Sequence, residues 1–275
     1  MRRGKRPRIG LALGAGGTKG SAHAGVLKVL EEAGVPIDLI AGSSIGAVYA
    51  ASYAAGVSGA EMVEDVLRTS PADVFAFFRK RLRLTPDNHL GAIMCRRLDG
   101  LEFADLRLPF TVVVSDLFQR RPVLIRKGSV LKAVEASIAV PMMASPVRLN
   151  GHYVVDGGFW EHAPVRVVAG MGAEKTIEVV LGESITVPRR FWPLTRRLVG
   201  LLDGPARRSG PSMAASAVFL LYILTYIPAH SRADVTIRPD IMNISANSPF
   251  HLSEAMKLGE EAARAALPEI EALFR

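Results

Sequence analysis

Ser44 stands between two glycines in the stretch DLIAGSSIGAVYA, which covers residues 38–50. A G-x-S-x-G pattern that a strand enters and a helix leaves is typical of a nucleophilic serine exposed at the top of a sheet. The same letters also occur where a small residue fits a tight turn. A serine becomes a nucleophile only when a base can take its proton. The interpretation of Ser44 therefore depends on what else the chain places within its reach.

Asp156 is the most suggestive candidate for that base. It ends the apolar stretch GHYVVD and is followed at once by Gly157 and Gly158, so its carboxyl group can lie close to another element. An ordinary Asp-Gly turn would have the same letters. A Ser-Asp-His order would instead require a late histidine, and the candidates are His230 and His251. The first follows a proline at a helix exit and the second opens the last helix, which is typical of solvated or capping residues.

The glycine-rich stretch GAGGTKG, residues 14–20, directly follows the first apolar run. Glycines between a strand and a helix let backbone N–H groups point into the space above a sheet, where they can bind an oxyanion. A dinucleotide-binding loop would look similar, but it needs an acidic residue at the end of the second strand. The chain has Ala41, Gly42, Ser43 and Ser44 at that position. A P-loop is excluded as well, because no G-K-[ST] closes the loop.

The elements that must position these residues follow one another closely in the first seventy residues. The apolar run 8–14 predicts a buried strand, 21–34 a helix, 37–43 a second strand and 45–56 a helix of small residues. Ser58 and Glu61 form a capping box that opens a third helix through residue 69. This order predicts a parallel, doubly wound α/β domain.

The rest of the chain is less regular. Residues 72–100 mix phenylalanines with arginines, which is typical of an amphipathic surface helix. The pattern predicts strands over 108–118, 121–128, 176–183 and 233–239, helices over 129–140 and 253–267, and a hairpin at Asn150–Gly151. Residues 213–227 are apolar but too short to span a bilayer, so they form either a buried core helix or an interfacial segment.

Composition narrows the class of protein further. The chain has 275 residues, a formal charge of +8 and a single cysteine, Cys95, which fits a reducing compartment. We expect one domain over 1–275, with a basic tail at 1–7 and an Arg/Pro/Gly-rich excursion at 189–211. The basic balance reflects either codon usage or attraction to an anionic surface. Aromatic residues do not alternate with the basic ones, so nucleic acid is not an expected partner.

Three blocks of this sequence together resemble the patatin-like phospholipase family. They are the glycine loop with the G-x-S-x-G elbow, the segment VEASIAVPMMASPVRLNGHYVVDGGFWEHAPV with its Asp-Gly-Gly signature, and the strand ADVTIRPDI. The resemblance implies a three-layer α/β/α fold with a mainly parallel central sheet. It implies a Ser44–Asp156 dyad without histidine, an oxyanion hole around Gly16, Gly17 and Thr18, and no metal or cofactor.

The resemblance also gives roles to the surrounding motif residues and to the substrate. The supporting residues are Gly14, Lys19, Gly20, Gly42, Gly46, Gly157 and Gly158. The implied activity is hydrolysis of fatty-acyl esters of lipids or lysophospholipids through an acyl-enzyme. A lipid acyltransferase or a catalytically idle scaffold would share the same fold. We expect a cytoplasmic protein with peripheral contact at the inner face of an anionic membrane.

Overall fold

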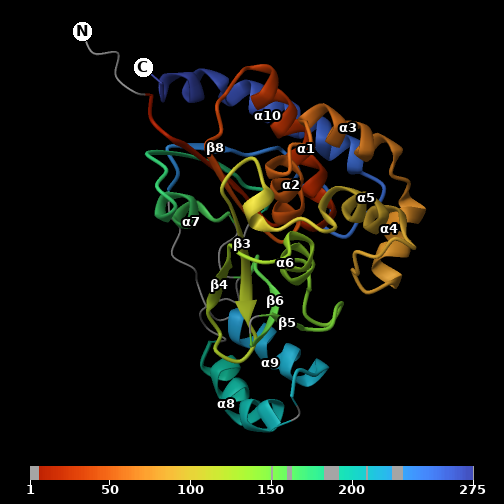
Figure 1. Cartoon of the computed structure of the whole chain (residues 1–275). Helices are drawn as coiled ribbons and strands as arrows, with labels where there is room; N and C mark the ends of the chain where they lie inside the picture. The colour runs from red at the N-terminus through yellow and green to blue at the C-terminus, as the bar shows by residue number, and fades with distance from the viewer. Residues whose placement is uncertain are drawn as a thin grey trace.

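The computed structural model describes residues 6–149, 151–159, 163–182, 192–208, 210–224 and 232–274. In this part of the chain eight strands form one sheet in the order β5-β6-β3-β2-β1-β7-β8, with β4 also paired to β3 (Figure 1). The strands are β1 (Ile9–Leu13), β2 (Leu39–Ser43), β3 (Phe110–Asp116), β4 (Pro122–Ile125), β5 (Val147–Leu149), β6 (His152–Asp156), β7 (Lys175–Val179) and β8 (Val235–Ile237).

Five of these strands run parallel and form the centre of the sheet. β1 pairs with β2 and β7, β2 with β3, and β7 with β8, all in parallel register. β4, β5 and β6 are antiparallel additions beside β3. β5 and β6 flank the predicted hairpin turn, in which Gly151 has φ 81° and Asn150 lies outside the described residues. The expectation of a mainly parallel α/β sheet is therefore confirmed.

The helices pack on both faces of the sheet. They are α1 (Ala22–Glu32), α2 (Ile45–Ala54), α3 (Gly59–Arg68), α4 (Pro71–Arg79), α5 (His89–Leu98), α6 (Val130–Ser137), α7 (Val165–Gly170), α8 (Trp192–Arg208), α9 (Met213–Leu224) and α10 (Leu252–Ala272). Two short 3₁₀ helices, η1 (Gly17–Ser21) and η2 (Phe103–Asp105), complete them. The predicted capping box of Ser58 and Glu61 is present at the start of α3.

Alternate residues of the central strands face opposite sides, as the pleat of a strand requires. On one face Leu11, Leu13 and Ile40 belong to the main core, to which α1, α2, α6 and α10 contribute. On the other face Ala12 and Ala41 belong to a smaller cluster with Val165, Val167 and Val168 around α7. Small side chains on this second face let the short helix α7 lie close to the sheet. The result is the three-layer arrangement expected of the family resemblance.

Helices α8 and α9 lie together at the lower end of the molecule in the view of Figure 1. For the Arg/Pro/Gly-rich residues 189–211 we expected an excursion and predicted no helix, but this stretch contains the long helix α8. In α9, Ala215, Val218 and Phe219 are buried with Val155 of β6 in a separate hydrophobic cluster. The residues at the centre of α9 are therefore packed inside the protein, whereas Ala214 near its start is exposed. Residues 225–227 lie outside the described residues. No helix within the described ranges combines the length and the apolarity that a bilayer span demands.

Candidate active site

The sheet brings Ser44 and Asp156 together although they are far apart in the sequence. β4 pairs with residues 112–115 of β3, and β2 and β6 pair with the same strand at residues 110–113 and 114–116. Because a strand has only two sides, β2 and β6 must share the side of β3 that faces away from β4. Ser43 is paired with Val113, and Asp156 is paired with the next residue, Val114. The carboxyl ends of β2 and β6 therefore meet end to end.

Ser44 occupies a strained backbone conformation between β2 and α2, with φ 54° and ψ −128°. A positive φ at a non-glycine residue costs about 1–3 kcal/mol and is found where the surrounding structure enforces it. The turn is enforced by close packing on both flanks. A Cβ atom on Gly42 would lie 2.5 Å from the Cα of Ala47, and one on Gly46 would lie 2.2 Å from the carbonyl oxygen of Leu13. The two glycines of the G-x-S-x-G pattern thus permit a sharp elbow.

The hydroxyl group of Ser44 donates a hydrogen bond of 2.5 Å to Oδ2 of Asp156. The other carboxyl oxygen, Oδ1, accepts a 2.7 Å hydrogen bond from the N–H of Gly158. Asp156 is only 3% exposed, and burial raises the pKa of its carboxyl group to about 7 in spite of these two hydrogen bonds. A carboxyl group with a pKa near neutrality is suited to exchange a proton with the serine.

Ser137 is a site residue that the sequence analysis missed. It lies at the end of α6, is fully buried, and its Oγ accepts a 2.9 Å hydrogen bond from the N–H of Ser44. The same hydroxyl donates a 2.7 Å hydrogen bond to the carbonyl oxygen of Val113. Ser137 therefore ties the elbow to β3 and satisfies an amide that the strained turn removes from the sheet. Only the tertiary fold brings these groups together, so no local pattern could have identified the residue.

The glycine loop lies beside the elbow and begins the helix η1–α1. The N–H of Thr18 donates a 2.8 Å hydrogen bond to the carbonyl oxygen of Ala246, so this amide is already used. Within the described part of the chain, no hydrogen bond occupies the N–H of Gly16 or of Gly17. The N–H groups of Gly16 and Gly17 therefore remain available to an oxyanion at this loop. Ala15, the one residue with a side chain between Gly14 and Gly17, does not have a positive φ, so the loop conformation does not require glycine at that position.

The other predicted motif residues surround this centre. Gly14 donates to the carbonyl oxygen of Val179, and its own carbonyl group lies 2.8 Å from Nε2 of the buried His23. Gly20 lies against Ile45 so closely that a Cβ atom there would be 2.1 Å from its side chain. A Cβ atom on Gly157 would be 2.1 Å from the carbonyl oxygen of Val113, and Lys19 lines the cavity.

Of the two late histidines that a Ser-Asp-His order would require, only His251 lies in the described part of the chain. His251 is exposed and its Nδ1 lies 2.8 Å from the carboxyl group of Glu254, and His230 lies outside the described residues. His152, four residues before Asp156, lies 2.6 Å from the carboxyl group of Asp116. In the part of the chain that the structure describes, Ser44 Oγ and the Asp156 carboxylate have no hydrogen-bonded histidine.

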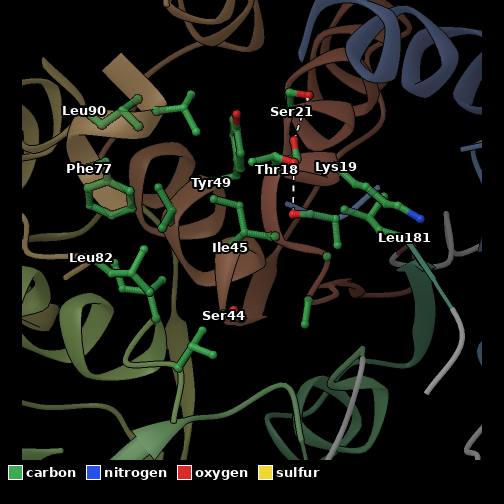
Figure 2. Close-up of a pocket in the computed structure, with 18 of the residues that line it drawn as sticks. Thr18, Lys19, Ser21, Ser44, Ile45, Tyr49, Phe77, Leu82, Leu90 and Leu181 are labelled. Atoms are coloured by element: carbon green, nitrogen blue, oxygen red, sulfur yellow. Dashed lines mark hydrogen bonds between the residues drawn. The ribbon is translucent and has the colours of Figure 1, made fainter. Parts of the chain in front are cut away.

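A cavity of about 640 Å³ opens above Ser44 and reaches both Asp156 and the glycine loop. Figure 2 shows Ile45 and Tyr49 of α2 between two groups of residues, with Thr18, Lys19 and Leu181 on one side. The other side is formed by side chains from the region of α4 and α5, including Phe77, Leu82 and Leu90. The segment 72–100, expected to be a surface helix, therefore supplies an apolar wall. Such a cavity fits a hydrocarbon chain whose carbonyl end lies at Ser44.

Comparison of the sequence with known protein families identifies the family of this chain. Residues 11–169 match the family described as patatin-like phospholipase. An uncharacterised NTE family protein of Mycobacterium tuberculosis strain H37Rv is 34% identical over 200 residues, which cover 67% of this chain and 52% of the relative. The chain is 32% identical over 185 residues to patatin-like phospholipase domain-containing protein 6 of Homo sapiens, covering 63% of this chain and 13% of that protein.

A lysophospholipase of Mycosarcoma maydis is 29% identical over 193 residues, which cover 66% of this chain and 10% of that protein. The chain thus spans about half the length of its mycobacterial relative. Among solved structures, VipD from Legionella pneumophila superimposes with a TM-score of 0.55 at 12% identity, covering 98% of this chain and 67% of VipD. At that identity the likeness concerns the fold.

Proposed function

Because this chain belongs to the patatin-like phospholipase family, we propose that it hydrolyses carboxylic esters of lipids with Ser44 as nucleophile and Asp156 as base. The observation that carries this proposal is the 2.5 Å hydrogen bond between the two side chains at a strained elbow beneath an apolar cavity. An unactivated serine is a weak nucleophile, and a hydrogen-bonded base is the feature that activates it.

In the first step the ionised carboxylate of Asp156 accepts the proton of Ser44 Oγ as that oxygen attacks the ester carbonyl carbon. The carbonyl π electrons move to its oxygen and form a tetrahedral oxyanion. The free N–H groups of Gly16 and Gly17, at the positive end of the helix η1–α1, are suited to stabilise this charge. The tetrahedral intermediate then collapses, and the protonated Asp156 gives its proton to the departing alcohol.

The second half of the reaction repeats these transfers with water. Asp156 takes a proton from water, the hydroxide adds to the carbonyl carbon of the Ser44 ester, and the free acid leaves as Ser44 recovers its proton. One group can perform both transfers because the pKa of Asp156 lies near 7, between those of a strong base and a strong acid. An ester suits this base, since an alkoxide needs less assistance to leave than an amine does.

The cavity supports a fatty-acyl chain as the acyl part of the substrate. Its wall includes Val48, Phe77, Leu82, Ile93 and Met94, which leave few polar partners for a hydrophilic substrate. We therefore propose phospholipids or lysophospholipids as the substrate class. These lipids place an apolar chain and an ester in one molecule.

The experiment that tests the proposal measures release of fatty acid from a panel of phospholipids and lysophospholipids. We expect Ser44→Ala and Asp156→Asn to lose at least about three orders of magnitude in turnover, and the double variant to be hardly worse, because the two groups act as one unit. Asp116→Asn is a matched control. Asp116 is also a buried strand-end aspartate, but it binds His152 and the amides of Phe118 and Gln119 instead of Ser44.

The control should stay within about tenfold of the wild-type turnover, since its substitution removes no group that touches the ester. Transfer of the acyl group to an added acceptor alcohol in preference to water would indicate an acyltransferase. A folded Ser44→Ala protein that still releases fatty acid would refute the proposal.

A further inference from the structure

Most of the exposed large apolar side chains in the described part of the chain fall into two groups, apart from Leu67 and Leu124. One group combines Met143 and Met242, which line the cavity, with the adjacent Met142 and with Phe75 and Phe250. The other is a row on the helix α8, made by Leu194, Leu198, Leu201 and Leu202. Single exposed apolar residues are normal on a soluble protein, whereas a contiguous group marks a surface that contacts something apolar.

The first group, here called the mouth rim, is continuous with the cavity above Ser44. Met143 and Met242 line the cavity and are also 37% and 62% exposed. The ring of Phe75 on α4 lies 6.0 Å from that of Phe250, which precedes α10. Phe250 is 68% exposed, although a phenyl ring is costly to hydrate. Phe75 and Phe250 thus connect α4 with the loop before α10, while Met143 and Met242 connect the loop after α6 with the same stretch through the cavity wall.

Arg79, Arg81 and Arg83 add positive charge to this border. Arg79 ends α4 and the other two lie on the turn after it, and all three are exposed, whereas Leu82 and Leu84 are buried and line the cavity. Leu82 packs with Ala139 and Ala144, so the turn lies beside the loop that carries Met142. Lys80 is paired with Asp87, but the three arginines form no ion pair with any described residue. Their charge is thus available to an external anion.

We propose that the mouth rim docks on a lipid surface that carries anionic headgroups. This inference rests on the proposed function, because docking there would open the cavity directly onto the lipid that supplies the substrate. Methionine and phenylalanine side chains can enter the interfacial region of a bilayer, while arginines at their edge bind phosphate oxygens of the headgroups. The row on α8 is the competing surface. Figure 1 places α8 at the opposite end of the view from α3 and well below α4.

The test measures binding of Ser44→Ala protein to vesicles by flotation, so that binding is scored without catalysis. Vesicles of phosphatidylcholine alone are compared with mixed phosphatidylcholine and phosphatidylglycerol vesicles at low and high salt. In this background we compare Met142→Asp with Phe250→Asp as a pair, and Arg79→Gln, Arg81→Asn and Arg83→Gln as a triple. Met142 and Arg81 have positive φ values, which aspartate and asparagine tolerate. Leu198→Asp with Leu201→Asp on α8 is the matched control.

We expect the arginine triple to lower partitioning onto anionic vesicles roughly a hundredfold at low salt. Each arginine near an anionic surface strengthens binding about fivefold, and three of them are removed. The Met142 and Phe250 pair should lower it at least about tenfold on the same vesicles. The α8 pair should bind like the parent protein. The parent should bind neutral vesicles more weakly than anionic ones, and its binding should weaken in high salt.

Several outcomes would overturn the proposal. They are equal binding to neutral and anionic vesicles, absence of binding by the parent protein, and loss of binding in the α8 pair with none in the rim variants. Each rim variant is also made with Ser44 intact and assayed on a water-soluble p-nitrophenyl ester. Normal turnover there shows that the variant is folded. Absence of vesicle binding by the parent protein, with normal turnover in the wild type, refutes the rim alone, whereas absence of turnover in the wild type refutes the proposed function.

Discussion

The buried carboxyl group of Asp156 should make the wild-type protein less stable than an Asp156→Asn variant at neutral and alkaline pH. Its pKa rises from the 3.8 of an ordinary aspartate to about 7 because burial penalises the charged form. The folded state therefore holds its proton over a range in which the unfolded chain has released it. The free energy of unfolding falls as the pH rises through this window.

The size of the effect follows from the two pKa values. The shift corresponds to about 4 kcal/mol of lost stability above pH 7 and to less than half of that at pH 5, where the folded carboxyl group is still protonated. An asparagine at position 156 carries no charge at any of these pH values. Its carbonyl oxygen can still accept a hydrogen bond from the N–H of Gly158. Its NH₂ group can donate a hydrogen bond to Ser44 Oγ, whereas in the wild type Ser44 Oγ donates to Asp156.

The assay is urea unfolding of both proteins at pH 5 and pH 8, followed by circular dichroism. With a denaturant slope of about 3 kcal/mol per molar, the Asp156→Asn midpoint should exceed that of the wild type by about 1.3 M at pH 8, and by less than half of that at pH 5. Asp38→Asn is the control of opposite sign. The Arg6 side chain holds the pKa of Asp38 below its usual value, so this variant should lose stability at pH 8. An Asp156→Asn variant that is no more stable than the wild type at pH 8 would refute the reasoning.

Two further predictions concern catalysis. Because only the ionised Asp156 can accept the Ser44 proton, kcat/KM for a soluble p-nitrophenyl ester should rise about tenfold per pH unit below its pKa of about 7 and be level above it; a rate that is independent of pH from 5 to 8 would contradict this. Gly17→Ala should lower turnover at least about a hundredfold, since a Cβ atom there would lie 2.3 Å from the Ala246 carbonyl oxygen and displace an oxyanion donor. Gly34→Ala, which has a similar φ of +66° but open space around it, should leave turnover unchanged.

The first part of the fold could be predicted because its signals are local. The central strands are continuous apolar runs bounded by glycines, and the expected strand 37–43 is found at Leu39–Ser43. The helix after the glycine loop ends where expected, with Gly34 in a left-handed conformation. The elbow could also be predicted, because strand, small flanking residues and helix follow one another without a gap.

The contacts that complete the site have no such local signal. Ser44 and Asp156 are 112 residues apart, and they meet only because β2 and β6 share one side of β3. The wall formed by Phe77, Phe78 and Leu82 was interpreted as a surface helix, because phenylalanines beside arginines look amphipathic whichever element they face. The hydrogen bond from Thr18 to Ala246 crosses 228 residues and could not be foreseen.

Three unfavourable features of this molecule meet at one point of the sheet. Ser44 has a strained backbone, Asp156 is a buried acid, and the Oγ atom of Ser43 is buried without a hydrogen-bond partner in the described chain. Each of these costs stability, and each lies within two residues of the junction between β2, β3 and β6. The surrounding strands β1, β2 and β3 instead bury their apolar side chains in the core. Strain held by a regular scaffold at a single hydrogen-bonded pair is the pattern expected of a reactive centre, and it argues against an idle scaffold, in which selection for stability would remove such costs.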